Sequence, residues 1–414
     1  MNCCRYFAVS RRRSARQEPT SSGEKTAVNS SSVYSSVETP GKLEGVEARV
    51  NAPSHREGDP SSGPPEDLLA AVCAVGFGGR VETLPGGRVN HAWRVHSGPG
   101  ASPRSAVLKW APPWVASVPQ MALDDRRILF EARALAALER HPRLSGISDD
   151  HVRAPRLLAT FEDRRAILME DLGDLPDLAT WLRSSGADEG AAYGYGRLLG
   201  DFIGRLHLNS MEDVALARRL DNRGVQRSRL VNQYAAVVGY AERARLPDAG
   251  DLGRRAVTFG ELLQRPGTCL VMGDLWPPSI LIAERELRLI DWEFATYGRP
   301  AQDVGHLAAH LWMQAHRAPD PSSAARWRSL LQSFFHAYGE ALGPQRKRLM
   351  GAADRAESAV HFGAEILTRT VGAFQAGYLY EGLAPDQPAV QEAVSVAALH
   401  LRRPGSHSVF AALQ

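Results

Sequence analysis

Apolar and polar residues begin to alternate regularly only after about Pro65. Leu68 to Val75 has the spacing of a short helix. Short, partly β-branched runs bounded by Gly, Pro or Asn then predict strands, so this part of the chain is rich in β-structure. The predicted strands are Arg80 to Leu84, Ala92 to His96, Ala106 to Trp110, Arg156 to Phe161 and Arg165 to Met169.

A long amphipathic helix is predicted between the third and fourth of these strands. Asp124 to Arg140 carries apolar residues at helical spacing, and we expect Asp124 and Asp125 in its first turn, where acidic groups are favourable. The pattern therefore predicts a small β-rich lobe with one long helix over residues 63–172.

The pattern over residues 173–414 is helical, with one interruption. Tyr195 to Leu208 has the apolar face of a packed helix, and the chain is helical again from Asp303 to its end. Ile280 to Asp291 instead places two apolar runs around residues 284–286, which predicts a hairpin. We therefore expect an α+β fold with two lobes, in which the larger, mainly helical lobe carries the hairpin.

Composition separates the first 62 residues from the rest of the chain. They are rich in Ser, Pro, Glu and Gly, and such a segment cannot bury enough apolar area to offset the entropy lost on ordering. Residues 1–62 are therefore predicted to be a disordered tail. Five arginines and no acid precede Glu18, as in a mitochondrial transit peptide. We favour a solvated tail and keep mitochondrial targeting as the alternative.

Charge and cysteine content narrow the class of protein. Of 414 residues, 44% are hydrophobic and 23% charged, and the net charge of +3 is spread along the chain, which argues against a nucleic-acid partner. No apolar run has the length of a bilayer span. The four cysteines form no C-x-x-C pair, so we expect a reducing, cytoplasmic location. P-loop and Gly-x-Ser-x-Gly patterns are absent.

The strongest chemical pattern surrounds the predicted hairpin. Asp274 begins D-L-x-x-x-S, and Ser279 stands where the kinase loop D-L-x-x-x-N has its asparagine; in that loop the aspartate is the catalytic base and the asparagine a metal ligand. Asp291 ends the hairpin, where a magnesium-binding aspartate is expected. Taken singly, Asp274 fits a turn cap and Asp291 a strand end. Together, with the hairpin between them, they favour a single catalytic cleft.

A second pattern lies upstream, in the predicted β-rich lobe. Lys109 ends the sequence AVLK, which has the form of the V-A-I-K strand whose lysine binds nucleotide phosphates. Glu131 lies on the long helix, where the ion-pair partner of that lysine is expected. Gly86, Gly87 and Asn90 belong to a turn suited to close approach over phosphates, although a Gly-Gly pair also forms ordinary hairpins.

Seven segments in a fixed order carry a family resemblance: GGRVNHAWRV, AVLKWAPPWV, FEARALAAL, ILMEDL, FIGRLH, VMGDLWPPSILI and LIDWEFATYGRPAQDVGHLAAHL. Residues from about 66 to 385 resemble the aminoglycoside phosphotransferase/choline kinase superfamily, and within it the methylthioribose kinase-like branch that includes fungal hydroxytryptamine kinases. The resemblance implies a two-lobed protein-kinase-like fold, ATP and Mg²⁺ as cofactors, and a small-molecule hydroxyl acceptor. That acceptor would be methylthioribose-, hydroxyindole-, amino alcohol- or aminoglycoside-like.

The resemblance also implies a role for each residue that matches a family motif. Lys109 would bind phosphates with Glu131 as its partner, and the interlobe hinge would meet adenine through its backbone. The implied cofactor-binding residues are Lys109, Glu131, Gly86, Gly87, Asn90, Met169, Glu170 and Leu172; the base is Asp274; the metal ligands are Asp291, Ser279 and Glu293; and the acceptor contacts are Arg369 and Trp276.

Three departures from the family pattern bear on activity. Met272 replaces a histidine that mainly packs, and Ser279 replaces the asparagine with a poorer metal ligand. Arg369 follows Thr368, where the family has an Arg-Arg pair that contacts methylthioribose, which argues against methylthioribose itself. The alternative to an active kinase is therefore a pseudokinase that binds nucleotide or a partner without catalysis.

Several other residues have a structural explanation that we favour. His306 and His310 are four apart, as metal ligands on a helix are, but their apolar surroundings favour a packed core. His207 is expected to be a hydrogen-bonded packing residue, and Asp303 a cap at a helix start. Trp292, like Trp276, flanks a key aspartate, where packing and an aromatic acceptor pocket explain it equally well.

Overall fold

The computed structural model of the protein describes residues 63–149, 151–184, 186–405 and 409–413. These residues belong to one compact unit that spans residues 56–414. The predicted tail over residues 1–62, with its arginine-rich start, lies outside the described residues.

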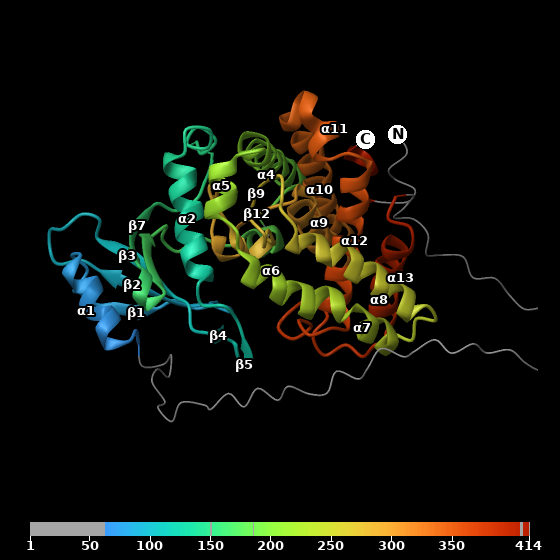
Figure 1. Ribbon diagram of the computed structural model, residues 1–414, viewed down its shortest axis with the longest axis horizontal. Helices are drawn as coiled ribbons and strands as arrows, with labels where there is room; N and C mark the ends of the chain where they lie inside the picture. The colour runs from blue at the N-terminus through green and yellow to red at the C-terminus, as the bar shows by residue number, and fades with distance from the viewer. Residues whose placement is uncertain (1–62, 150, 185, 406–408, 414) are drawn as a thin grey trace, which may run out of the picture. The chain divides into compact units, whose positions relative to one another are not determined.

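The N-terminal part of the unit is built on a five-stranded antiparallel sheet in the order β1-β2-β3-β8-β7 (Figure 1). The predicted strands are confirmed, with ends that differ by a residue or two. Their bounds are β1 Val81–Thr83, β2 His91–His96, β3 Ser105–Trp110, β7 Leu157–Phe161 and β8 Ala166–Glu170.

The two faces of this sheet pack against different helices. Alternate strand residues such as Leu108 and Leu168 form a small core with helix α1, Glu66–Ala74. The strand residues that alternate with these, such as Ile167, face helix α2, Arg127–Arg140, on the opposite side of the sheet (Figure 1). Lys109 follows Leu108 and so belongs to the α2 face, which is why it meets the C-terminal part of the protein.

Two details of this region differ from the prediction. Helix α2 begins at Arg127, so Asp124 and Asp125 precede it; Asp124 accepts hydrogen bonds from the backbone N–H and the guanidinium of Arg126 instead. A hairpin of β4, Trp114–Val115, and β5, Val118–Ala122, was not predicted. Its strands are too short and too polar to show an alternating pattern.

The C-terminal part is mainly helical, as predicted. Its largest helix pair is α4 with α10, where Gly196 and Gly200 let the α10 backbone approach closely because a Cβ there would meet the carbonyls of Leu330 and Phe334. The helices are α3 Leu178–Arg183, α4 Glu189–Ser210, α5 Val214–Arg219, α6 Arg223–Arg229, a π-helical turn Leu230–Ala235, α7 Val237–Arg243, α8 Ala249–Gly260, α9 Pro300–His316, α10 Pro321–Leu342, α11 Arg346–Leu349, α12 Ala352–Thr370 and α13 Pro388–Arg402.

The predicted hairpin is confirmed as β10, Ile280–Ala283, and β11, Glu286–Leu289. Strand β11 also pairs in parallel with β6, Val152–Arg153, which ties the hairpin to the segment that follows α2. Expecting the hairpin to be the one interruption of the helical region was wrong. A second antiparallel pair, β9 Cys269–Val271 with β12 Thr296–Gly298, encloses the hairpin in sequence.

The α+β fold class is thus confirmed, with a sheet-rich N-terminal region and a helical C-terminal region. Pairing of β9 with β12 brings together the residues just after β9 and those just before β12, so the loops that carry Asp274 and Asp291 become neighbours. Within the described part of the chain, no helix combines the length and apolar character of a bilayer crossing.

Candidate active site

The loop that follows β9 is fixed by the carboxylate of Asp303, which lies on helix α9. The backbone N–H groups of Met272 and Gly273 donate to Asp303 at 2.8 and 2.7 Å, and His207 lies 3.3 Å from the same carboxylate. Gly273 has a φ of +83°, and a Cβ there would collide with the carbonyl of Phe294, so glycine is required before Asp274.

Asp303 therefore does not cap a helix, contrary to the prediction. Helix α9 begins at Pro300 with Arg299 in the N-cap position, and Asp303 lies within the first turn, fully buried. His207 is a buried, hydrogen-bonded packing residue as expected, because its other ring nitrogen lies 3.0 Å from the hydroxyl of Tyr338.

Ser279 closes the loop that begins at Asp274. Its hydroxyl donates to the carbonyl of Trp276 at 2.8 Å and lies 3.5 Å from the carbonyl of Asp274, while the N–H of Trp276 lies 3.3 Å from Ser279 Oγ. The side chain is buried, so in this arrangement the hydroxyl serves the loop. Its role as a metal ligand stays a prediction.

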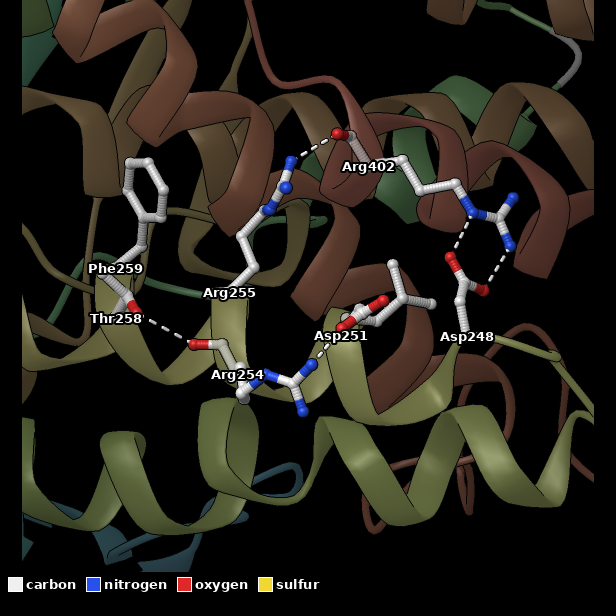
Figure 2. Close-up of a pocket in the computed structure, with 8 residues that line it drawn as sticks. Asp248, Asp251, Arg254, Arg255, Thr258, Phe259 and Arg402 are labelled. Carbon is white, nitrogen blue, oxygen red and sulfur yellow. Dashed lines mark hydrogen bonds and ion pairs between the residues drawn. The ribbon is translucent and has the colours of Figure 1, made fainter. Parts of the chain in front are cut away.

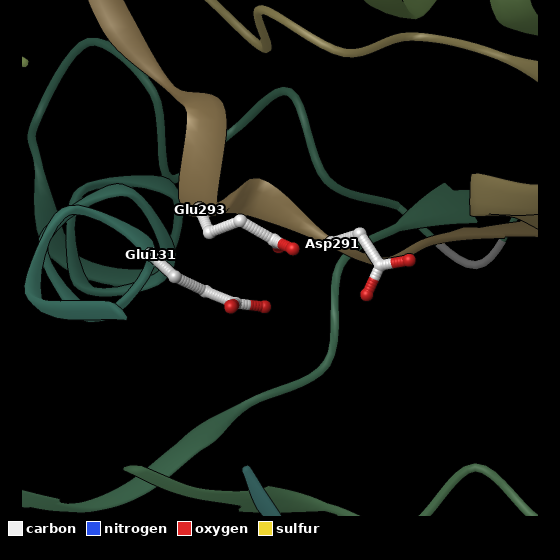
Figure 3. Close-up of side chains that lie close together, drawn as sticks. All are labelled: Glu131, Asp291 and Glu293. Atoms are coloured by element: carbon white, nitrogen blue, oxygen red, sulfur yellow. The ribbon is translucent and has the colours of Figure 1, made fainter. Parts of the chain in front are cut away.

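Lys109 lies at the centre of three carboxylates. Its Nζ is 2.8 Å from an oxygen of Glu131, of Asp291 and of Glu293. Figure 3 shows these side chains close together, Glu131 from α2 and the other two from the segment that follows β11. The predicted Lys109–Glu131 pair is present, and Glu293, predicted only as a further ligand, contacts the same lysine.

The charges in this cluster do not balance. Burial opposes the charge on Lys109, but the three carboxylates outweigh it and raise the pKa of Lys109 well above its ordinary value. Burial raises the pKa of Glu131 to about 8, against the attraction of Lys109, and raises that of Glu293 as well. Three carboxylates face one cation, so acidic groups are in excess. The raised pKa values mean that protons partly neutralise this excess, and a further cation would displace them.

The donor set of the cluster fits a hard divalent cation. Oxygen atoms of Glu131, Asp291 and Glu293 all lie within 4.8 Å of one another, and Mg²⁺ prefers carboxylate oxygens. Asp291 has a φ of 66°, in the left-handed region, and 39% of its side chain is exposed, whereas Glu131 and Glu293 are buried. Asp291 is therefore the accessible ligand of the three.

The glycine-containing turn between β1 and β2 is tied to this cluster through Asn90. The side-chain amide of Asn90 donates to Glu293 at 3.0 Å and accepts from Nε of Arg127 at 2.9 Å. Gly86 has a φ of +92°. A cavity of about 240 Å³ borders the turn and is lined by Gly86, Gly87 and Asn90 among others. The predicted nucleotide turn thus lies beside the lysine cluster.

Arg127 is a residue that the sequence did not single out. Its guanidinium is fully buried and donates to Asn90 and to the carbonyls of Pro112, Val89 and Trp114. Burial lowers the pKa of Arg127 to about 10. This side chain fixes the glycine-containing turn and the β4–β5 hairpin to the start of α2.

The segment that ends β8 carries the predicted hinge residues Met169, Glu170 and Leu172. The Glu170 carboxylate accepts from the Arg153 guanidinium at 2.7 and 3.0 Å, which pins this segment to β6. Asp171, which was not singled out, accepts from Arg94 at 2.7 Å. Both side chains are engaged in holding the hinge, and contact of its backbone with adenine stays a prediction.

Arg369 and Trp276, the predicted acceptor contacts, lie together on the other side of Asp274. The Arg369 guanidinium is 5.2 Å from the Trp276 ring and 5.1 Å from that of Tyr378, within cation–π distance. Its Nε donates to Glu365 at 2.7 Å. Trp292 instead is fully buried and donates to the Leu289 carbonyl at 2.9 Å, so it packs.

His306 and His310 of α9 are buried in a polar interior, and within the described residues they belong to no metal-binding cluster. His310 lies 3.1 Å from Glu365 and 2.6 Å from the Tyr378 hydroxyl. His306 lies 3.0 Å from Nη1 of Arg229, whose Nη2 donates to Asp274 at 2.9 Å. Arg229 lies in a polar stretch without a recognisable motif, so no sequence signal marked it.

A larger cavity of about 660 Å³ lies elsewhere, on α8 and the end of α13 (Figure 2). Its charged side chains pair with one another: Arg402 donates to Asp248 at 2.6 Å, and Arg254 contacts Asp251. None of the predicted site residues lines it.

Comparison with known proteins places the chain in a family. Residues 80–350 match the phosphotransferase enzyme family, and the chain belongs to it. It is therefore a phosphotransferase that acts on small molecules, and the resemblance inferred from the sequence is confirmed.

Two enzymes of similar sequence agree with this assignment. The chain is 27% identical over 246 residues to the 4-hydroxytryptamine kinase of Psilocybe cyanescens, which covers 57% of this chain and 68% of that enzyme. It is 34% identical over 113 residues to the methylthioribose kinase of Bacillus velezensis, covering 25% of this chain and 29% of that enzyme. The choline kinase structure of Cryptosporidium parvum aligns with 82% of this chain and 95% of its own at 12% identity, with a TM-score of 0.45.

Proposed function

We propose that this phosphotransferase moves the γ-phosphoryl group of ATP to a hydroxyl group of a small molecule and that it requires Mg²⁺. The observation that carries the proposal is that two sets of residues lie next to each other. Lys109 and its carboxylates lie on one side, and Asp274 lies on the neighbouring loop, which the pairing of β9 with β12 brings alongside.

In this mechanism the protein contributes positioning and charge. Lys109 binds the nucleotide phosphates, and Glu131 holds the lysine in place. The acceptor oxygen attacks the γ-phosphorus while the bond to the β–γ bridging oxygen breaks and ADP leaves. Asp274 orients the acceptor hydroxyl and takes its proton.

Asp291 and Glu293 are the residues that would hold Mg²⁺, with Ser279 as the further predicted ligand. The metal would supply neutralisation of phosphate charge. The excess negative charge around Lys109 and the accessible carboxylate of Asp291 support this part of the proposal.

The acceptor would bind on the side of Asp274 that holds Arg369 and Trp276. The faces of Trp276 and Tyr378 are already occupied by the Arg369 guanidinium. An acceptor with hydroxyl or anionic groups suits this surface better than a quaternary ammonium group, which would compete with Arg369 for the same rings. The named activities of the relatives, on 4-hydroxytryptamine and methylthioribose, mark the compounds to try first.

ADP release from Mg-ATP by the purified protein tests the proposal. The acceptor panel would contain methylthioribose, hydroxytryptamines, choline, homoserine and aminoglycosides, with the Asp274→Asn variant beside the wild type. Acceptor-dependent ADP release that is lost in the variant is the expected result. Binding of Mg-ATP without turnover on any acceptor, together with turnover restored by Ser279→Asn, would favour the pseudokinase alternative instead.

A further inference from the structure

We infer that Arg229 is a positioning residue for Asp274: it fixes one carboxylate oxygen so that the other faces the acceptor hydroxyl. Nη2 of Arg229 donates to Oδ1 of Asp274 at 2.9 Å. Among the described residues, the hydrogen bonds and ion pairs of the Asp274 carboxylate involve Oδ1, and 26% of the side chain is exposed. The inference rests on the proposed function, because it assigns Asp274 the role of base.

Arg229 is itself held in place from the opposite side. Its side chain is only 7% exposed, its Nη1 lies 3.0 Å from Nδ1 of His306, and its guanidinium is 5.2 Å from the Phe294 ring. It ends α6 where the π-helical turn Leu230–Ala235 begins, and such turns are frequent at functional sites. A long side chain already held by His306 and Phe294 loses little further entropy when it binds Asp274.

Behind Arg229, buried polar side chains continue into the helical interior. An arginine can only donate, so Nδ1 of His306 accepts from it, and Nε2 of His306 lies 3.2 Å from the Tyr234 hydroxyl. The Tyr234 hydroxyl lies 2.5 Å from Nδ1 of His361, and His361 Nε2 faces Glu357 at 3.4 Å. The bonds therefore run from Arg229 across α9 and the π-helical turn to α12.

The protonation state of His306 agrees with acceptance of the Arg229 hydrogen bond at Nδ1. Burial and the neighbouring Arg229 charge hold the pKa of His306 well below its ordinary value, so the ring is neutral and able to accept. Gln233 lies 3.2 Å from His306 and donates to Glu365 at 2.6 Å, and Glu365 accepts from Arg369. Arg229 at the base and Arg369 in the proposed acceptor site are thus held by one interior network.

A positioning role differs from a purely structural one in its kinetics. Replacing Arg229 by glutamine removes a charged hydrogen bond to Asp274, and we expect kcat to fall about 30-fold while the KM for ATP changes less than about twofold. Arg229→Lys keeps a charged donor and should restore part of kcat. In an Asp274→Asn background, Arg229→Gln should cause no further loss, because the residue acts through Asp274.

A matched pair at His306 tests the anchor. Asparagine places its amide oxygen near the position of Nδ1 and can accept from Arg229, whereas leucine cannot. We expect kcat within about threefold of the wild type for His306→Asn and about 10-fold lower for His306→Leu, with no effect of the leucine once Arg229 is glutamine. Equal effects of the two substitutions, or independent losses for Arg229→Gln and Asp274→Asn, would overturn the inference.

Urea unfolding of wild type, Arg229→Gln, Asp274→Asn and the double variant tests the contact without any turnover. If Arg229 holds Asp274, the two substitutions shift the unfolding midpoint non-additively. Additive shifts overturn the inference even in an active enzyme. If no acceptor supports turnover, the proposed function fails, and this measurement still decides whether Arg229 holds Asp274.

Discussion

The charged residues on the two sides of Asp274 differ in how far their charges balance. Around Lys109, one buried cation faces the carboxylates of Glu131, Asp291 and Glu293. On the other side, Arg229 and Arg369 reach Asp274 and Glu365 from helices, and aromatic rings surround the guanidinium of Arg369. The first side has an excess of negative charge suited to a metal ion, and the second has its charges paired.

The first side would carry the chemistry that any phosphoryl transfer needs, and the second side would recognise one particular acceptor. Phosphates and metal need a lysine and carboxylates at fixed places, so short motifs supply them. An acceptor needs a surface of particular shape and charge, and the surface proposed for it comes from α6, α9, α12 and the segment after α12. Substitutions on the first side should therefore affect nucleotide and metal binding, and substitutions on the second side should affect the acceptor.

The largest effect is expected at Asp274, where the two sides meet. Asp274→Asn should lower kcat about 10³-fold because the amide cannot accept the hydroxyl proton. Mg-ATP should still raise the melting temperature, since Lys109 and its carboxylates are untouched. Near-wild-type turnover of the variant would contradict the role of Asp274 and with it the division into two sides.

A change at Lys109 should affect stability as well as activity. Lys109→Gln leaves three carboxylates without their central cation, and removing one partner of a buried ionic group costs about 3–5 kcal/mol of unfolding free energy. Mg²⁺ alone should then raise the melting temperature of the variant more than that of the wild type. Calcium and EDTA serve as controls, and an identical response of both proteins to Mg²⁺ would argue against a metal site in this cluster.

Arg369 should matter for the acceptor and not for the nucleotide. Arg369→Gln loses a charged donor beside Trp276, so we expect the KM for the acceptor to rise about 10-fold with the KM for ATP unchanged. The matched control is Arg402→Gln, which removes an arginine paired with Asp248 on the distant cavity. A rise in the KM for ATP would show that the two sides are not separate.

The smallest effect concerns pH and the buried histidines of the helical region. Burial lowers the pKa of His306, His310 and His400 below the ordinary value of about 6.5. The unfolded chain takes up protons at these groups below that pH while the folded protein does not. Their contribution to stability is therefore complete above pH 6.5 and declines below it, by up to about 1.4 kcal/mol per pH unit for each group.

Urea unfolding between pH 7.5 and 5 measures this decline. His400→Asn should reduce the slope by about one group's share, whereas replacing the exposed His336 should leave it unchanged. A slope that His400→Asn leaves unchanged would mean that His400 takes up a proton as readily in the folded protein as in the unfolded chain.

The sequence by itself determined the two-part α+β order and the phosphate side of the site. Lys109, Asp274 and Asp291 each stand in a local motif, because a strand end, a loop or a hairpin fixes their spacing within a few residues. The hairpin was predictable for the same reason. The short strands β9 and β12 were not, since three residues carry no periodic pattern.

Only the tertiary structure decided the role of Asp303, the anchoring of the glycine-containing turn and the acceptor side. Asn90 meets Glu293 across 203 positions of the sequence, and Arg229 meets Asp274 across 45. Such partners leave no spacing to detect, because helix packing and not chain connectivity brings them within hydrogen-bond distance. A buried polar group must find a partner when the chain folds, and which partner it finds depends on the helices that pack around it.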